Sequence, residues 1–357
     1  MKNRIIFLLM TTIVAFTLSN CRKDNVDNTN ISNIKIEGWE LDSTDFIYNW
    51  ISPTDLDFLN SKTGYIIGST GYLLKTTDSG NSWIKSYIET DSIGVMPSSI
   101  SFINDSTGYI YGTWNVLNGD YYGILYKTTD GGNHWTKQYY NTAYHLLSLK
   151  FFDTSNGIAL NWINSGSYAV TTSNGGLSWE VANIDLDPSF NRLFFLGEIC
   201  YATGKNQKIF KSVDHGKTWS TINTPVSSPN SIRGFYFMDD NFGFLDCIDK
   251  KYKTTDGGKT WSVINLPFTK FFTPYSPGEY FHFCNNNDGI SVVDSLAFSG
   301  GDFISFIGTY VYTTTNGGNS WLRSNFLKQF SFGLVVYVSD NLAYGISNNY
   351  IYTLMKK

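Results

Sequence analysis

One motif recurs six times along this 357-residue chain and limits the possible folds more than any other feature. Each copy holds an Asp or Asn, a glycine two residues later and a tryptophan three residues after that glycine. Successive tryptophans are 40 to 60 residues apart, which is the length of one propeller blade. The copies are Asp78 with Trp83, Asp130 with Trp135, Asn174 with Trp179, Asp214 with Trp219, Asp256 with Trp261, and Asn316 with Trp321.

The motif has the chemistry of a β-hairpin turn. The residues before it, such as 72–77, are good strand formers. An Asp or Asn side chain can accept hydrogen bonds from nearby backbone N–H groups, and glycine can adopt a positive φ. The tryptophan that follows offers a large apolar anchor. Because Asn replaces Asp in two copies, we expect these side chains to be structural rather than catalytic.

A second motif alternates with the first and occurs seven times. It consists of an aromatic residue, a polar turn and a small residue six positions later, and each copy predicts an inner strand and the start of a second strand. Four short strands per repeat predict an all-β fold, a single seven-bladed β-propeller of four-stranded antiparallel blades. Six or eight blades are the alternatives. The copies are 58–64, 102–108, 151–157, 194–200, 237–243, 283–289 and 337–343.

The two ends of the chain supply complementary parts of one repeat. The seventh repeat stops after a strand at 350–353, where a seventh turn motif would begin. Residues 34–36 and Trp39 precede the first complete repeat and have no turn motif of their own. We expect this N-terminal strand to form the outer strand of the last blade, which would protect an open sheet edge.

The turn motif resembles the Asp-box, or bacterial neuraminidase, repeat. Its Thr-Thr-Asp-Gly-Gly-x-x-Trp form is most similar to that of the photosystem II stability and assembly factor family. The resemblance covers nearly the whole predicted mature chain and implies a propeller. Propellers with this repeat include sialidases, xyloglucanases, sortilin-type receptors and assembly factors, so the resemblance does not by itself imply one function.

The N-terminus predicts export and lipidation. Basic Lys2 and Arg4 precede an apolar stretch, and residues 18–21 resemble the lipobox of bacterial lipoproteins. We expect a signal peptide at 1–20, lipidation of Cys21, a polar tether at 21–30 and the propeller at 31–357. The expected location is the cell envelope, at the outer membrane, on its periplasmic or surface side. An ordinary signal peptide with a chance cysteine is the alternative.

Composition argues against several classes of ligand. The net charge is −4 and becomes more negative once Lys2 and Arg4 are removed, which argues against a nucleic acid partner. Beyond Cys21, the cysteines are Cys200, Cys247 and Cys284, an odd number at irregular spacing, and the chain has only four histidines. We expect neither a disulfide framework, nor a metal site, nor a cofactor.

Catalysis has little support in the sequence. A sialidase would need an arginine triad, but beyond the tether the chain has only Arg192, Arg233 and Arg323. Other glycosidases need two carboxylates that face one cleft, and Glu279 and Asp302 are the best-placed pair. We therefore expect no catalytic residues. If the protein is an enzyme, glycoside hydrolysis is the expected class.

Several insertions carry aromatic residues. They follow the second strand of a repeat or connect repeats, at 114–122, 162–168, 267–280 and 294–303, and so are predicted to gather on one face. Aromatic anchors on varied loops are typical of protein or glycan recognition. Covering of blade edges is the alternative. The candidate binding residues are Trp114, Tyr121, Tyr122, Trp162, Phe272 and Tyr275.

Two arginines extend this predicted face. Arg192 and Arg233 lie two and four residues before the inner-strand aromatics Phe194 and Phe237, and even offsets place both on the same side of their strands. Together they could capture a carboxylate, although pairing with local acids is the alternative. The sequence thus predicts an envelope lipoprotein that acts as a protein-binding or assembly scaffold. A carbohydrate-binding or glycan-hydrolysing lipoprotein is the alternative.

Overall fold

The regular secondary structure of the computed structural model is almost entirely β-strand within the described residues. It describes residues 5–6, 35–36, 39–46, 53–88, 95–115, 121–141, 146–163, 166–184, 186, 193–226, 232–247, 250–265, 279–283, 285, 287–299, 303–323, 327–328, 334–339, 342–347 and 350–356. Within these ranges the strands form seven antiparallel sheets, most of them four-stranded, and the predicted all-β class is confirmed. No helix among these residues is long and apolar enough to cross a membrane.

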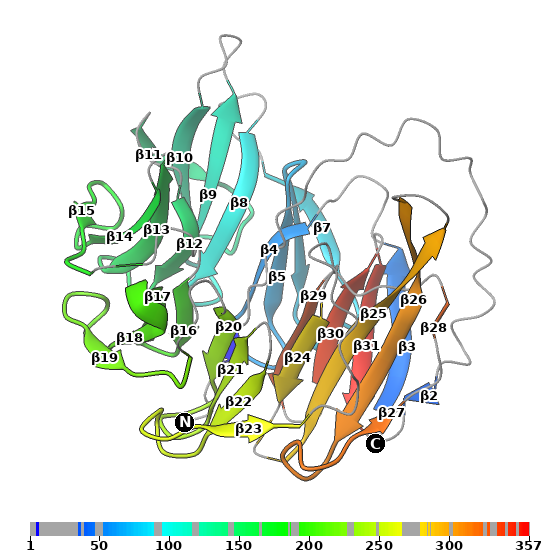
Figure 1. Ribbon diagram of the computed structural model, residues 1–357. Coiled ribbons are helices and arrows are strands. Elements are labelled where there is room, and N and C mark those ends of the chain that lie inside the picture. Colours follow the sequence, from blue (N-terminus) through cyan, green and yellow to red (C-terminus); the bar gives the residue numbers. More distant parts are fainter. Residues whose placement is uncertain are drawn as a thin grey trace. The chain divides into compact units, whose positions relative to one another are not determined.

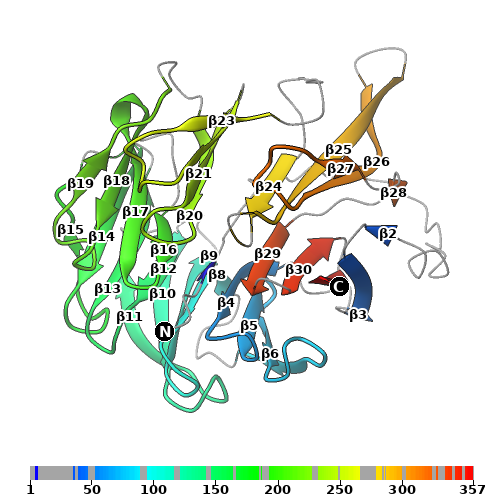
Figure 2. The ribbon, with the colours of Figure 1, turned by 90° about the horizontal axis from the view of Figure 1, so that it is seen from below.

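The chain divides into two compact units, and the larger one holds five sheets (Figure 1). In each sheet, consecutive strands pair in chain order. The sheets are β4 (Pro53–Phe58), β5 (Gly64–Gly68), β6 (Tyr72–Thr76) and β7 (Ile84–Tyr87); β8 (Val95–Phe102), β9 (Gly108–Asn115), β10 (Tyr121–Thr128) and β11 (Thr136–Asn141); β12 (Leu146–Phe151), β13 (Gly157–Ile163), β14 (Gly166–Thr172) and β15 (Glu180–Val181); β16 (Leu193–Leu196), β17 (Ile199–Gly204), β18 (Lys208–Ser212) and β19 (Ser220–Ile222); and β20 (Ile232–Phe237), β21 (Gly243–Cys247), β22 (Lys251–Thr254) and β23 (Ser262–Ile264). The short β1 (Ile5–Ile6) adds to the free edge of β16, and Figure 2 shows β16, β17 and β18 from below.

The smaller unit holds the other two sheets. In one, β3 pairs with β31 from Trp39 opposite Lys356 to Phe46 opposite Tyr350, so strands from distant parts of the chain share a sheet (Figure 1). Of the expected N-terminal residues, Trp39 begins β3, the strand next to β31, and Lys35 and Ile36 form a fifth strand beside β3. The sheets are β24 (Glu279–Phe283), β25 (Gly289–Ser299), β26 (Phe303–Thr314) and β27 (Leu322–Arg323), with β28 (Leu327–Lys328) paired to β26; and β29 (Leu334–Ser339), β30 (Leu342–Ser347), β31 (Tyr350–Lys356), β3 (Trp39–Phe46) and β2 (Lys35–Ile36).

Aromatic contacts join neighbouring sheets in the larger unit. Phe102 stacks on Tyr65 of the preceding sheet with ring centroids 3.6 Å apart, and its edge meets Trp135 of its own sheet at 6.1 Å. Phe151 repeats this arrangement with Tyr109 at 3.6 Å and Trp179 at 6.1 Å. Such pairs stabilise a protein by more than their buried area alone. The two sequence motifs therefore meet in the core, because the first supplies the tryptophan and the second the phenylalanine.

The small residue of the second motif makes room for this phenylalanine. A Cβ atom on Gly108 would lie 2.6 Å from the Phe102 ring, and one on Gly64 would lie 2.2 Å from the Phe58 ring. The fourth copy has Cys200 instead. Its phenylalanine, Phe194, is tilted by 37° against Tyr201 at a centroid distance of 5.7 Å.

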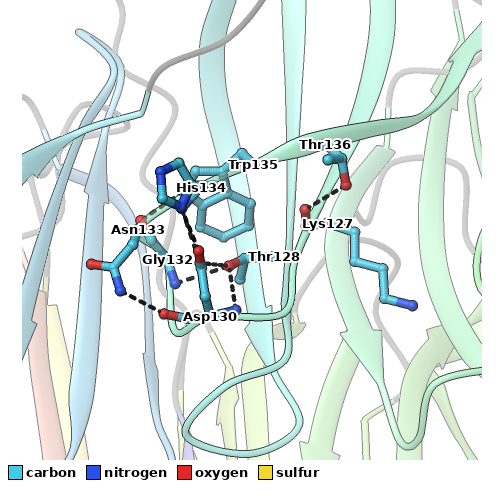
Figure 3. A network of polar contacts seen from close by, with 8 residues as sticks. All are labelled: Lys127, Thr128, Asp130, Gly132, Asn133, His134, Trp135 and Thr136. Atoms are coloured by element: carbon cyan, nitrogen blue, oxygen red, sulfur yellow. Dashed lines mark hydrogen bonds and ion pairs between the residues drawn. The ribbon is translucent and has the colours of Figure 1, made fainter.

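Each of the six turn motifs contains a hydrogen-bond network centred on a hydroxyl group. In Figure 3, the buried Thr128 donates from Oγ1 to Asp130 Oδ1 at 2.8 Å and accepts from the backbone N–H of Gly132 at 3.0 Å. Asp130 Oδ1 also accepts from the backbone N–H of His134 at 2.9 Å. Thr76, Thr172, Ser212, Thr254 and Thr314 form the same pair of bonds in the other copies. Sequence reasoning missed this hydroxyl.

The network explains why Asp and Asn interchange. The hydroxyl of Ser82 donates to Asp78 Oδ2 at 2.6 Å. In an Asn copy the direction reverses, and Asn174 Nδ2 donates to the hydroxyl of Ser178 at 2.8 Å. Both side chains also accept the backbone N–H of that serine through Oδ1. The turn thus requires an oxygen acceptor at this position but not a charge.

Replacing Thr128 with Val is expected to destabilise the protein by about 1–3 kcal/mol, because the buried N–H of Gly132 would lose its acceptor without a change in side-chain volume. The free energy of unfolding from urea titrations measures this cost. Thr129→Val is the matched control, since the adjacent Thr129 is exposed. Equal stabilities of the two variants would contradict the role of this hydroxyl.

The Asp turns are expected to contribute an acid-sensitive part of stability. Hydrogen bonds from the hydroxyl and backbone N–H of Thr260, and from Thr254, lower the pKa of Asp256 to about 2. A pKa lowered on folding gives stability that is present above the unfolded value and is lost as the pH falls through the folded value. Asp256→Asn should therefore flatten the dependence of unfolding free energy on pH between about pH 4 and pH 2. Urea titrations across this range test the expectation, and parallel curves for parent and variant would refute it.

Candidate functional site

Five polar side chains gather on the first strands of three consecutive sheets. We call Asp55 and Asp57 on β4, Ser99 and Ser101 on β8, and Lys150 on β12 the inner-strand cluster. The two carboxylates and the two hydroxyls are buried, and the Lys150 side chain is 13% exposed. Each residue of the cluster precedes an inner-strand phenylalanine by one or three positions. The sequence could therefore have predicted that these polar side chains lie on the first strands.

The cluster connects each first strand to the next one through side chains. Asp55 Oδ2 accepts the backbone N–H of Ile100 at 2.8 Å, and Asp57 Oδ2 accepts that of Phe102 at 2.6 Å. One sheet further, Ser99 and Ser101 accept the N–H groups of Leu149 and Phe151, both at 3.0 Å. Side-chain acceptors therefore satisfy main-chain donors on the strand edges, which have no ladder partner there.

Electrostatics within the cluster differ between its two carboxylates. Burial raises the pKa of Asp55 well above its ordinary value, although the hydrogen bonds from Ile100 and Ser99 oppose this shift. Asp57 Oδ1 is buried without a hydrogen-bond partner in the described part of the chain, and Lys150 Nζ lies 4.0 Å from it. At this distance the Lys150 ammonium on β12 attracts the Asp57 carboxylate on β4, although one sheet lies between these two strands in chain order. Asp55 accepts backbone N–H groups at both oxygens and Asp57 at one, so the arrangement is suited to joining strands.

Metal and thiol chemistry have little support among the described side chains. No three His, Cys, Asp or Glu side chains within the described ranges are grouped so that they could hold a metal ion. The side chains of Cys200 and Cys247 are buried, and burial raises the pKa of the Cys200 thiol. A raised pKa disfavours the nucleophilic thiolate.

Part of the predicted binding face lies outside the described residues. Arg192, Phe272, Tyr275 and the lipidation residue Cys21 belong to this part. For the remaining candidates the backbone alone is described: Trp114, Tyr121, Tyr122, Trp162 and Arg233.

The insertions differ from the expected loops, because strands extend into them. Trp114 and Tyr122 are directly opposite each other in the β9–β10 ladder, and Trp162 is opposite Ser167. The β25–β26 ladder continues as far as Ser299 opposite Phe303. Aromatic residues favour extended backbone, so these insertions prolong hairpins instead of ending them. Trp114 and Tyr122 are thereby brought together, whereas their proximity to the other candidates stays a prediction.

The backbone at Arg233 affects the proposed arginine pair. The β20–β21 register shifts between Ile232 and Gly234, so Arg233 lies at a bulge-like irregularity. Strict alternation of side chains does not hold through such a position. The even offset from Phe237 therefore does not determine the side on which Arg233 lies, and its proximity to Arg192 stays a prediction.

Comparison with known proteins agrees with the repeat pattern. The family model described as photosynthesis system II assembly factor YCF48 matches residues 32–143 and 133–265, more than half of the chain. The photosystem II assembly lipoprotein Ycf48 of Prochlorococcus marinus (strain NATL2A) is 30% identical over 92 residues, which are 26% of this chain and 25% of that protein. The chain thus matches only about a quarter of the length of this relative.

Solved structures extend the likeness over most of the chain. A structure titled YCF48 bound to D1 peptide has a TM-score of 0.59 at 15% identity and covers 91% of this chain and 99% of its own. The WD40 β-propeller domain of Doa1 has a TM-score of 0.53 at 12% identity and covers 90% and 98%. At these identities the likeness concerns the fold, and that fold is a β-propeller. Together with the family match, it shows that the chain belongs to the photosynthesis system II assembly factor YCF48 family.

Proposed function

We propose that this protein is a non-catalytic, lipid-anchored scaffold of the cell envelope that binds a protein partner. The family match over residues 32–265 carries the proposal. A solved member of the same fold is titled as bound to a peptide, which supports a protein as the class of partner. The carboxylates of the inner-strand cluster accept backbone N–H groups of the next sheet, so we assign them a structural and not a catalytic role.

The proposed scaffold is a seven-bladed propeller in which each of the seven sheets is one blade. In this arrangement β3 supplies the outer strand of the last blade, and β29, β30 and β31 supply the other three. The pairing of β3 with β31 supports this closure. Closure that uses strands from both ends of the chain would protect sheet edges that are otherwise open to another chain.

We propose that the mature protein begins at Cys21 and is held at the outer membrane by lipid on that residue. The name of the Prochlorococcus relative, an assembly lipoprotein, supports a lipid anchor. The polar residues 21–30 would then be the tether between the lipid and the propeller.

Cys21→Ser is expected to move the protein from the membrane fraction to the soluble fraction, because stable anchoring needs more than one acyl chain and this residue would carry them. Fractionation followed by immunoblotting measures the shift. Cys284→Ser, which removes a different cysteine, should leave the protein at the membrane. A Cys21→Ser variant that still sediments with membranes after a high-salt wash would exclude the lipobox interpretation.

The extended β9–β10 hairpin is the proposed centre of the partner-binding face, because Trp114 and Tyr122 oppose each other there. Cross-strand aromatic pairs present a large apolar surface, and aromatic anchors dominate many interfaces. Trp162, Phe272, Tyr275 and the arginines Arg192 and Arg233 would extend this face.

The double variant Trp114→Ala with Tyr122→Ala is expected to lower partner recovery at least tenfold, in the range for loss of an interface hot spot of about 2 kcal/mol. Recovery is measured by affinity purification from detergent-solubilised envelopes after crosslinking, with quantitative mass spectrometry. Tyr87→Ala removes an exposed aromatic side chain from the outer strand β7 and is the matched control. Equal recovery from both variants, at unchanged thermal stability, would place the interface elsewhere.

A further inference from the structure

Aspartate and serine perform the same task at equivalent positions of the inner-strand cluster. Asp55 Oδ2 accepts the backbone N–H of Ile100 at 2.8 Å, and one sheet further Ser99 Oγ accepts that of Leu149 at 3.0 Å. Each of these donors lies two positions before the phenylalanine of its strand. A neutral hydroxyl is therefore sufficient to satisfy such a donor, and the negative charge of Asp55 is not required for it.

The cluster also holds more negative than positive charge in a buried position. Asp55 and Asp57 are 4% and 2% exposed, and Lys150 is the one cationic member of the cluster. Its Nζ lies 4.0 Å from Asp57 Oδ1, so its attraction is directed at that carboxylate. Ionisation of both aspartates would leave one uncompensated negative charge within the cluster. Burial of an unpaired charge is costly, and a carboxyl group in such a position is neutralised by a proton instead.

Few titratable groups surround Asp55 in the described part of the chain. Asp57 lies on the same strand, and β5 and β8 pack against that strand. β8 has no titratable side chain, and β5 has one, Tyr65, which is directly opposite Asp57. Burial raises the pKa of Tyr65, so this side chain is neutral at physiological pH. Lys150 on β12 completes the set. Asp55 is therefore the group of the cluster that can change its charge near neutral pH.

Two effects compete at Asp55. Its carboxylate form is stabilised by three donors, the N–H groups of Leu56 and Ile100 and the hydroxyl of Ser99. Burial and the charge of Asp57 favour the neutral acid, and burial is the largest effect, so the pKa of Asp55 is raised well above its ordinary value. A serine hydroxyl can accept a hydrogen bond as well as donate one. Ser99 can therefore turn and remain a partner of a protonated Asp55.

We propose that a proton is a structural ligand of the inner-strand cluster, bound by Asp55 at neutral to mildly acidic pH and shared with Ser99 in a reversed hydrogen bond. The bound proton balances the buried charge. Its loss at higher pH leaves that charge uncompensated and destabilises the joint between the first strands of three sheets. At the proposed location in the envelope, the stability of the scaffold would respond to external pH, a consequence that rests on the proposed function.

The dependence of stability on pH tests the proposal. A carboxyl group whose pKa is higher in the folded than in the unfolded protein takes up a proton on folding, so stability falls as the pH rises between the two values. The unfolding equilibrium constant of the parent should therefore increase with pH above about pH 4, by at most about tenfold per pH unit. Urea titrations of the full chain in detergent, from about pH 5 to about pH 8, measure this slope.

Two variants show whether the slope comes from Asp55. Asp55→Ser introduces the neutral acceptor that the next sheet uses, and its unfolding constant should increase less steeply with pH than that of the parent. Asp105→Ser removes an exposed carboxylate and is the matched control, which should keep the slope of the parent. The chain has four histidines, which titrate in the same range in all three proteins, so the difference between parent and variant isolates Asp55.

Infrared spectroscopy detects the proton directly, because the C=O group of a carboxylic acid absorbs at a higher frequency than a carboxylate. At about pH 6, where exposed carboxyl groups are ionised, the parent spectrum minus that of Asp55→Ser should show a carboxylic acid band. The same difference with Asp105→Ser should lack it. Asp57→Asn removes the neighbouring negative charge and should lose the band at a lower pH than the parent.

Either measurement can overturn the proposal. A stability slope of Asp55→Ser equal to that of the parent, or no carboxylic acid band assigned to Asp55 at about pH 6, would show that the three donors keep Asp55 ionised. Should Asp55→Ser not fold, the parent and Asp57→Asn spectra decide, because an unchanged titration of the band in Asp57→Asn would also overturn the proposal. Neither readout involves the partner or the lipid anchor, so failure of the scaffold role would leave both intact.

Discussion

The structure of the larger unit depends on one aromatic contact, the placement of a first-strand phenylalanine between a tyrosine of the preceding sheet and a tryptophan of its own turn. Phe102 occupies this position between Tyr65 and Trp135. The contact of the phenylalanine with the tyrosine joins two sheets. Its contact with the tryptophan holds the turn of its own sheet in place. Most other features of the repeat allow or stabilise the packing of this phenylalanine ring. The glycine opposite it leaves space, and the turn network holds the tryptophan against it, with Trp135 Nε1 donating to Gly132 O at 3.1 Å.

The residues around this contact vary as a set. In the sheets that carry the turn motif, a tyrosine at this position has a lysine as its direct cross-strand partner, as in Tyr65 with Lys75, where the ammonium lies 5.3 Å from the ring centroid. In these sheets the turn motif that follows the lysine has Asp and not Asn at its first position. In the third sheet the corresponding residues are Ile158, Thr171 and Asn174. The sixth repeats this with Ile290, Thr313 and Asn316. Cation, aromatic face and carboxylate are thus gained or lost together, which keeps the local charge balanced. The lysine also reaches the following sheet, where Lys211 Nζ lies 3.0 Å from Asp240 Oδ1.

The sequence predicted the class of fold and the turn residues because both depend on local chemistry. An Asp or Asn followed by glycine describes a turn without knowledge of its neighbours. The hydroxyl in that turn could also have been predicted from the sequence. The first residue of each Thr-Thr pair is always Thr or Ser, whereas the second is Val213 in the fourth copy. Other features depend on residues far away in the sequence and could not be predicted from local patterns. Asp55 accepts hydrogen bonds from the Ser99 hydroxyl and the Ile100 backbone N–H, 44 and 45 positions later, and no local pattern indicates such contacts. The register shift at Arg233 is equally non-local, because it is a property of two strands and not of one.

The sheet that begins with β16 departs from the repeat at several independent positions. Leu196 stands where the first turns of five other sheets have an Asn or Asp that accepts two backbone N–H groups, as Asn60 does. The β16–β17 connection is accordingly a tight turn, with Leu196 opposite Ile199. Cys200 replaces the glycine under the phenylalanine. His215 adopts a φ of 63° where four of the other turn motifs have glycine, and its ring stacks on Phe152 at 4.3 Å. In the last sheet Ser339 and Ala343 stand at the same two positions as Leu196 and Cys200, so the first turn and the residue beneath the aromatic ring are where the repeat tolerates change.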